Sequence, residues 1–296
     1  MSLKGYTKKL IIPGFEGLSL YEVSMFFYKG LAEGALTTRA SSLAFNFFLA
    51  FFPSIIVLFT LIPFVPIEGF QEQLFVLIRD ILPPLTFDAT KSILDDIVNN
   101  EQGGLLSLTF VLALYFSTNG VNAMITGFNA TYHLSDKRTW WELRLLSFAL
   151  TVVLAILLIL TIIFQLFSQG FMSNLVSEGY LHQYSVDIIL YAKWLILVFV
   201  LFISYSILFY YGPADKKGWK FLSAGSIITT FLSVVSSLGF SYYVNNFAQY
   251  NQLYGSIGTL LVILLWMYFN SIILLLGFEL NASIVSAKEK QQNKLD

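Results

Sequence analysis

A polar stripe lies inside an apolar run at Tyr115–Asn129, which reads YFSTNGVNAMITGFN. Its polar side chains recur every three or four residues, so they share one face of a helix. They are Tyr115, Asn119, Asn122, Thr126 and Asn129. An unpaired amide in hydrocarbon costs several kcal/mol, so this face must meet other helices or a hydrated cavity. The stripe is therefore either interhelical hydrogen bonding, worth about 0.6 kcal/mol per bond, or one wall of a polar pathway.

The composition places this stripe in a polytopic membrane protein. Of 296 residues, 56% are hydrophobic and 12% are charged, whereas soluble domains carry about 25% charged residues. The net charge of −1 gives no field that would recruit nucleic acid, so no nucleic-acid partner is expected. Cysteine is absent and histidine occurs twice, so we predict no disulfide framework, no metal site and no cofactor.

We predict an all-α fold with six transmembrane helices, each near the ~20 apolar residues that a bilayer core requires. The spans are 41–65, 104–130, 145–167, 187–211, 219–243 and 256–280. An amphipathic helix over 15–38 is expected to lie in the membrane interface. Short helices are expected to cap the opposite side within the acidic loop 66–103. The chain then divides into an N-terminal segment 1–40, a membrane domain 41–286 and a tail 287–296.

Basic residues give the orientation. Most of the 17 lysines and arginines fall in the N-terminal segment, the second-to-third and fourth-to-fifth loops, and the tail. Cytoplasmic loops carry such an excess. Both termini are therefore predicted to be cytoplasmic.

Several motifs have a familiar order among these spans. They are TRASSLAF at 38–45 with FFP at 51–53, YGP at 211–213, YGSIG at 254–258 and GFELNA at 277–282. Together they resemble the YihY/BrkB family of bacterial inner-membrane proteins, which an older label calls ribonuclease BN-like. The resemblance covers roughly residues 20–285. It implies a six-helix inner-membrane protein, often proposed to be a transporter, and it brings no agreed catalytic or binding residues.

The ribonuclease label is weighed against the residues themselves. Metal-dependent RNA hydrolysis needs several His and Asp ligands converging on the metal. His133 and His182 lie on opposite sides of the predicted membrane, and no HxH or HExxH spacing occurs. We therefore predict that the chain is not an enzyme and has no catalytic residues.

Polar residues of two other spans are further candidates. In the fifth span, Gly225, Thr229, Ser233, Ser237 and Ser241 repeat every four residues. This ridge favours close helix packing, and hydroxyl lining of a pore by Thr229 and Ser233 is the second interpretation. In the fourth span, Lys193 either extends outward beside Asp187 or faces a vestibule and attracts an anionic head group.

Arg39 and Glu279 should both lie near the inner face, one before the first span and one ending the sixth. They either form a partly buried ion pair or reach the interface separately. The sequence leaves both alternatives open.

These features predict a transporter of a weakly charged or amphiphilic, lipid-like substrate. Its polar cavity would contact Asn119, Asn122 and the face of the fifth span, because the mid-membrane groups are amides and hydroxyls rather than carboxylates. The alternative is a non-transporting scaffold that binds lipid or a partner protein. Membrane lipids are expected partners in both cases, and homo-oligomerisation is left open.

Overall fold

The computed structural model describes residues 14–60, 103–131, 137–177, 183–215, 217–247 and 256–293, and every regular element in these ranges is a helix. The helices are α2 (Leu20–Glu33), α3 (Leu36–Thr60), α6 (Gly103–Asn129), α7 (Trp140–Ser177), α8 (Gln183–Tyr211), α9 (Ala224–Phe247) and α11 (Ser256–Gln292). The predicted all-α class is confirmed over these ranges. The predicted cap helices of 66–103 lie outside the described residues.

Among the described residues, four helices are long and apolar enough to cross a membrane. The segments are Trp140–Gln165 of α7, Lys193–Tyr211 of α8, Ala224–Val244 of α9 and Leu260–Gln292 of α11. The bent pair Leu20–Ala32 and Leu36–Ser54 makes a fifth if it counts as one span. α6, whose first side chains lie outside the described residues, is not among them. The chain is a multi-pass helical membrane protein by these criteria, and six spans stay a prediction.

Several helices extend beyond the predicted spans. α7 runs from Trp140 to Ser177 rather than over 145–167, and α11 continues to Gln292 rather than ending at 280. Beyond 280 the chain continues with NASIVSAKEKQQ, whose Ala, Lys, Glu and Gln residues favour helix without being apolar. An apolar run therefore indicates membrane depth and not the full length of a helix.

The amphipathic helix predicted over 15–38 is interrupted at Gly34, which corrects that boundary. α2 ends before Gly34, and Ala35 has a left-handed φ of 44°. The segments on either side form an angle of 67°. A Cβ on Gly34 would lie 2.7 Å from the Arg39 Nη2 atom. The interruption therefore leaves room for the Arg39 guanidinium beside the start of α3.

α2 begins with a capping box and packs against α11. The Ser19 side chain accepts from the Glu22 backbone N–H, and the Glu22 carboxylate accepts from the Ser19 backbone N–H. This satisfies two donors that a helix start leaves unpaired. Leu18 and Val23 are buried in one cluster with Ile284 of α11.

An ion-pair cluster fastens the segment before α2 to two other parts of the chain. The Glu16 carboxylate pairs with the Lys288 ammonium near the end of α11. It also lies 3.1 Å from the Lys220 ammonium, which belongs to the connection between α8 and α9. The cluster brings three distant stretches of sequence to one end of the molecule.

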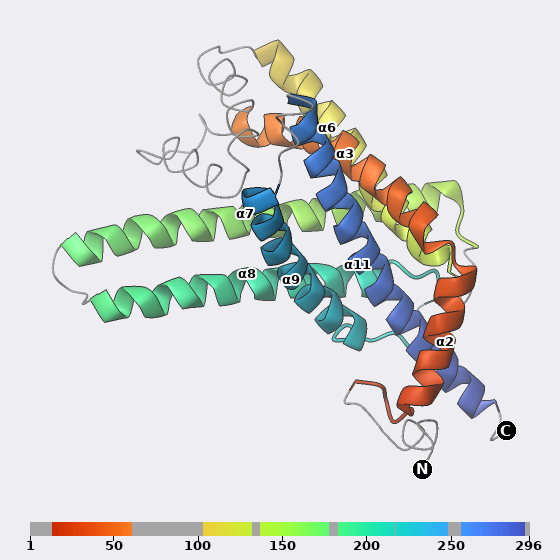
Figure 1. The fold of residues 1–296 in the computed structure, drawn as a ribbon. Helices are drawn as coiled ribbons and strands as arrows, with labels where there is room; N and C mark the ends of the chain where they lie inside the picture. Colours follow the sequence, from red (N-terminus) through yellow and green to blue (C-terminus); the bar gives the residue numbers. More distant parts are fainter. Residues whose placement is uncertain are drawn as a thin grey trace.

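The helices fall into two groups that run in different directions (Figure 1). α7 and α8 form a long antiparallel hairpin that extends to one side. α3, α6 and α11 run together, and α9 packs between α8 and α11. The start of α2 and the end of α11 lie at the same end of the molecule.

An aromatic core holds the two groups together. The Phe128 ring stacks on the Phe278 ring at 4.2 Å between centroids, and Trp219 stacks on the other side at 5.0 Å. Phe209 packs edge-on against both phenylalanines. The three phenylalanines are 0% exposed, and each buried ring contributes roughly 1.5–3 kcal/mol. α6, α8 and α11 are thereby fixed at the junction beside which the polar residues lie.

Candidate functional site

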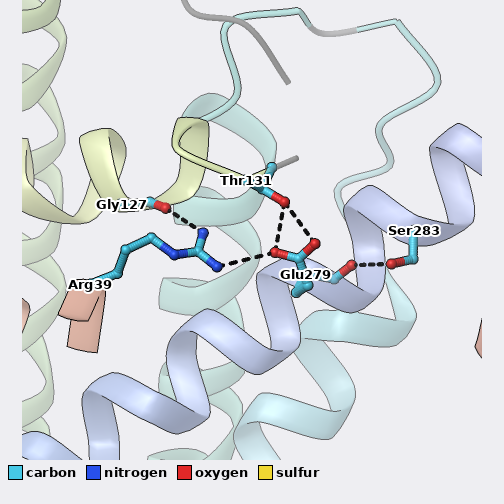
Figure 2. A network of polar contacts seen from close by, with 5 residues as sticks. All are labelled: Arg39, Gly127, Thr131, Glu279 and Ser283. Atoms are coloured by element: carbon cyan, nitrogen blue, oxygen red, sulfur yellow. Dashed lines mark hydrogen bonds and ion pairs between the residues drawn. The ribbon is translucent and has the colours of Figure 1, made fainter. Parts of the chain in front are cut away.

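A buried ion pair joins α3 to α11. The Arg39 Nη2 atom lies 3.4 Å from Glu279 Oε2, and Nη1 donates a 2.9 Å hydrogen bond to the Gly127 carbonyl of α6 (Figure 2). The Thr131 hydroxyl donates to the Glu279 carboxylate, 2.6 and 2.7 Å from its two oxygens. Arg39 is 9% exposed and Glu279 is 0% exposed. Of the two alternatives that the sequence left open, the structure contains the pair.

The pair makes the positions of three helices depend on one another. Removing one partner of such a pair typically costs about 3–5 kcal/mol, because the other charge stays buried and unpaired. The Arg39 Nε atom is buried without a hydrogen-bond partner. The guanidinium therefore has hydrogen-bonding capacity left over. Chemically, the site holds two opposite charges out of water, and their contact depends on the relative position of α3 and α11.

Asn119 and Asn122 of the predicted stripe contact α7. Asn119 Oδ1 accepts a 2.5 Å hydrogen bond from Arg144 Nη1, and Asn122 Oδ1 accepts a 3.3 Å bond from the Ser147 hydroxyl. Both amides are half-buried. This half of the stripe therefore contributes to the contact between α6 and α7.

Tyr115 and Thr126 of the same stripe are exposed, whereas Asn129 is buried. Asn129 Nδ2 donates to the Ile125 and Gly212 carbonyls at 2.8 and 3.0 Å, and its Oδ1 accepts from the Ala214 N–H at 2.9 Å. These bonds hold the connection that follows α8 against the end of α6. The YGP motif at 211–213 thus lies where α6, α8 and the start of the next connection meet.

The predicted small-residue ridge of α9 divides into two parts. Gly225 and Thr229 are buried where α9 meets α11. A Cβ on Gly277 of α11 would lie 1.6 Å from the Thr229 hydroxyl oxygen, so only glycine permits this approach. Ser233 shares a 2.8 Å hydrogen bond with the Tyr205 hydroxyl of α8. Ser237 and Ser241 beyond them are exposed.

The structure does not bring the predicted cavity residues together. Asn119 and Asn122 face α7, whereas Thr229 and Ser233 face α11 and α8. Lys193 is half-buried on α8, and no described carboxylate pairs with it. The Asp187 side chain lies outside the described residues. Helical spacing predicts which residues share a face of one helix, but it carries no information about which helix that face meets.

An apolar groove lies between α3 and α11 instead. Its volume is about 460 Å³, and its lining includes Ser41, Ala44, Phe45, Leu261, Leu265 and Tyr268. No residue of the predicted cavity contributes to it. The groove begins two residues after Arg39, on the same helix pair that the ion pair joins.

The order of these motifs and helices agrees with one known family. The family described as "Virulence factor BrkB" matches residues 27–296. The chain belongs to the BrkB family. The resemblance that the sequence motifs indicated is thereby confirmed.

Curated relatives align with nearly the whole BrkB-family chain. The ribonuclease-like protein YfkH of Bacillus subtilis is 29% identical over 254 residues, which cover 85% of this chain and 91% of YfkH. A UPF0761 membrane protein of Coxiella burnetii is 24% identical over 262 residues, 85% of this chain and 89% of the relative. Another, from Aggregatibacter aphrophilus, is 23% identical over 277 residues, with 91% and 94% covered. No solved structure matches the chain.

The ribonuclease-like name belongs to the relative and carries no residue assignment. Within the described ranges, no group of three or more His, Asp or Glu side chains is placed to hold a metal ion. His133 and His182 lie outside those ranges. The absence of enzymatic activity in this BrkB-family chain stays a prediction.

The sequence did not identify Thr131 and Arg144 among the residues that form the polar contacts. Thr131 lies just past the predicted end of the second span, and Arg144 was counted among cytoplasmic loop charges. Both lie one helical turn or less outside a predicted span. Extending each predicted span by a turn at its polar ends would have included them among the candidates.

Proposed function

We propose that this BrkB-family protein moves a weakly charged or amphiphilic molecule across the bacterial inner membrane. The buried pair between Arg39 and Glu279 is the observation that carries the proposal. Ionisable groups inside a membrane bundle are expensive, and by default they indicate a functional site. A pair shared by three helices is suited to control the relative position of those helices.

The proposed topology has six spans, formed by α3, α6, α7, α8, α9 and α11, with both termini in the cytoplasm. The excess of lysine and arginine on one side supports this orientation. Arg39 lies near the start of α3, and α11 continues for several turns beyond Glu279. In this topology the ion pair lies toward the cytoplasmic side.

The proposed path follows the groove between α3 and α11 rather than the amide stripe. The side-chain oxygens of Asn119, Asn122 and Asn129 already accept hydrogen bonds from protein donors. The groove has an apolar lining, which suits an acyl chain or another apolar body. Because α3 contributes to both the groove and the ion pair, a shift of α3 would change both together. Breaking and re-forming the pair would accompany alternating access.

The test is lipid movement in liposomes that contain the purified full-length protein. The probe is a short-chain phosphatidylglycerol with a fluorescent nitrobenzoxadiazole label, and its movement is measured by dithionite quenching. We expect the protein to accelerate quenching and Glu279→Gln to slow it by about tenfold, which corresponds to about 1.4 kcal/mol. Glu289→Gln is the matched control, because Glu289 lies on the same helix and is exposed; this variant should equal the unaltered protein.

A non-transporting scaffold is the second candidate. It is favoured by the hydrogen bonds from α7 to Asn119 and Asn122, which assign these amides to helix packing. If the unaltered protein moves the probe no faster than protein-free liposomes, transport of this amphiphile is contradicted and the scaffold is supported.

A further inference from the structure

Arg144 is a cation for which the described residues supply no carboxylate partner. Its Nη1 atom donates to Asn119 Oδ1 at 2.5 Å. Its guanidinium carbon lies 5.5 Å from the centre of the Trp140 ring and 6.0 Å from that of Tyr115. Within the described part of the chain, no carboxylate forms an ion pair with it. A guanidinium has five N–H donors, so one amide leaves most of them unused.

The surroundings of Arg144 are open on the membrane side. Trp140 is 59% exposed and Tyr115 is 55% exposed, although both rings contact the guanidinium. Arg144 lies one turn inside the end of the apolar segment Trp140–Gln165. Trp140 begins α7, and tryptophan at the end of a span is typical of the level of lipid head groups.

Two exposed apolar faces lead away from this point. Phe148 and Val152 follow Arg144 by four and eight residues, so they lie on the same side of α7. Val111 and Leu112 precede Tyr115 by four and three residues, so they share its side of α6. A cationic, aromatic head site therefore continues into apolar surface on both helices. This is the order of chemical groups along a phospholipid.

We propose that Arg144, together with Trp140 and Tyr115, binds the phosphate of an anionic phospholipid whose acyl chains lie along α6 and α7. The planar guanidinium matches a phosphate in a two-point geometry. Asn119 holds one edge of the guanidinium, which directs the remaining donors toward the ligand. A guanidinium near the end of a span lies within reach of lipid head groups, and an anionic head group supplies the charge that the described carboxylates do not. The site is independent of the proposed transport, because it lies on α6 and α7 rather than on the groove between α3 and α11.

Native mass spectrometry of the full-length protein, titrated with phosphatidylglycerol and with phosphatidylcholine, tests the site. We expect tight binding of phosphatidylglycerol that Arg144→Gln weakens by about tenfold, the factor expected from losing a charged hydrogen-bond donor. Phosphatidylcholine binding should not change. Lys137→Gln removes an exposed charge near the same end of α7 and should leave both affinities unchanged. An equal loss in the Lys137 and Arg144 variants, or no loss in the Arg144 variant, would overturn the proposal.

Asn119→Asp keeps the test informative if Arg144→Gln does not fold. It places a carboxylate beside Arg144 and supplies the missing anion from within the protein. We expect this variant to fold and to lose its preference for phosphatidylglycerol over phosphatidylcholine, and a retained preference would overturn the site.

Glycerol phosphate serves as a competitor without acyl chains. Failure to displace the lipid at millimolar concentration supports a lipid site, whereas complete displacement would overturn the lipid assignment.

The two proposals fail separately. If Arg144→Gln loses the lipid preference but moves the probe normally, the lipid site is supported and the transport proposal is unaffected. Loss of probe movement on Glu279→Gln with normal lipid preference leaves the lipid site standing.

Discussion

Arg39 and Arg144 are both arginines near the start of an apolar helix, yet their surroundings are opposite. Arg39 is buried and pairs with the Glu279 carboxylate, which also accepts a hydrogen bond from the Thr131 hydroxyl. Together with the bond from Arg39 to the Gly127 carbonyl, these contacts join α3, α6 and α11. Arg144 is half-buried, and its protein partners are an amide oxygen and two rings. A charge that the chain neutralises itself contributes to helix position. A charge that the chain leaves unneutralised is available to a ligand.

Breaking the buried pair should have the largest effect. Glu279→Ala leaves Arg39 buried without its anion, and we expect a loss of about 3–5 kcal/mol of unfolding free energy. Sodium dodecyl sulfate titration of the purified protein measures it. The double variant Arg39→Ala/Glu279→Ala should cost clearly less than the sum of the single variants, and additive losses would contradict the pairing.

Adding a side chain at the glycine contact between α9 and α11 should have the second-largest effect on stability. Gly277→Ala places a Cβ 1.6 Å from the Thr229 hydroxyl oxygen and 2.9 Å from the Gly225 carbonyl. Overpacking of this kind costs about 1–3 kcal/mol, occasionally more. The same titration should show part of the loss restored by Thr229→Ala. Gly239→Ala is the matched control, since no heavy atom lies within 4 Å of its added Cβ; a loss as large as that of Gly277→Ala would argue against a contact-specific effect.

Within the amide stripe, the burial of each asparagine should decide how much stability its removal costs. Asn129→Ala removes three hydrogen bonds from a buried residue. We expect a loss of about 1–3 kcal/mol, because the Ala214 N–H loses its acceptor and the Gly212 carbonyl keeps only its bond from Arg138. Asn122→Ala removes one 3.3 Å bond at a half-buried position, which should cost about 0.6 kcal/mol. Thermal unfolding midpoints of the two variants provide the comparison. Equal shifts would mean that the two asparagines have equivalent roles.

The smallest effect should be a pH dependence at Glu16. Burial opposes its ionisation, but the hydrogen bonds and positive charges of Lys288 and Lys220 outweigh burial and hold the pKa below the ordinary 4.5. A lowered pKa in the folded state stabilises the fold fully above 4.5, and this contribution disappears as the pH falls through the folded value. We expect it to be about 1 kcal/mol or less. Thermal midpoints between neutral and acidic pH should fall less steeply for Glu16→Gln; an unchanged slope would refute the linkage.

The helices themselves were largely predictable from the sequence. The spans 104–130 and 187–211 were placed close to α6 and α8, because long apolar runs are a strong signal. The predicted first span begins at 41, after the observed start of α3 at Leu36. The reason is that the turn at Gly34 and Ala35 depends on a left-handed residue and on the room that Arg39 needs. The predicted sixth span ends at 280, before the observed end of α11 at Gln292, because residues that favour helix continue beyond the apolar run.

The candidate site was predictable only in part. Asn119 and Asn122 were recognised as inward-facing amides, but their partners Arg144 and Ser147 lie on a helix whose position the sequence does not encode locally. The ion pair of Arg39 and Glu279 joins residues 240 positions apart, so only their shared depth suggested it. Periodicity specifies a face within one helix, whereas the neighbour of that face is decided by packing such as the stacked rings of Phe128 and Phe278.

The fastening of Glu16 to Lys288 and Lys220 has a practical consequence for handling the protein. The Lys290 ammonium lies 5.5 Å from the centre of the Phe26 ring, so fluorescent donors and acceptors placed at the nearby exposed Tyr28 and Gln291 would start in proximity. Their separation would report any detachment of the amino-terminal segment in living cells, without altering a residue of the bundle interior.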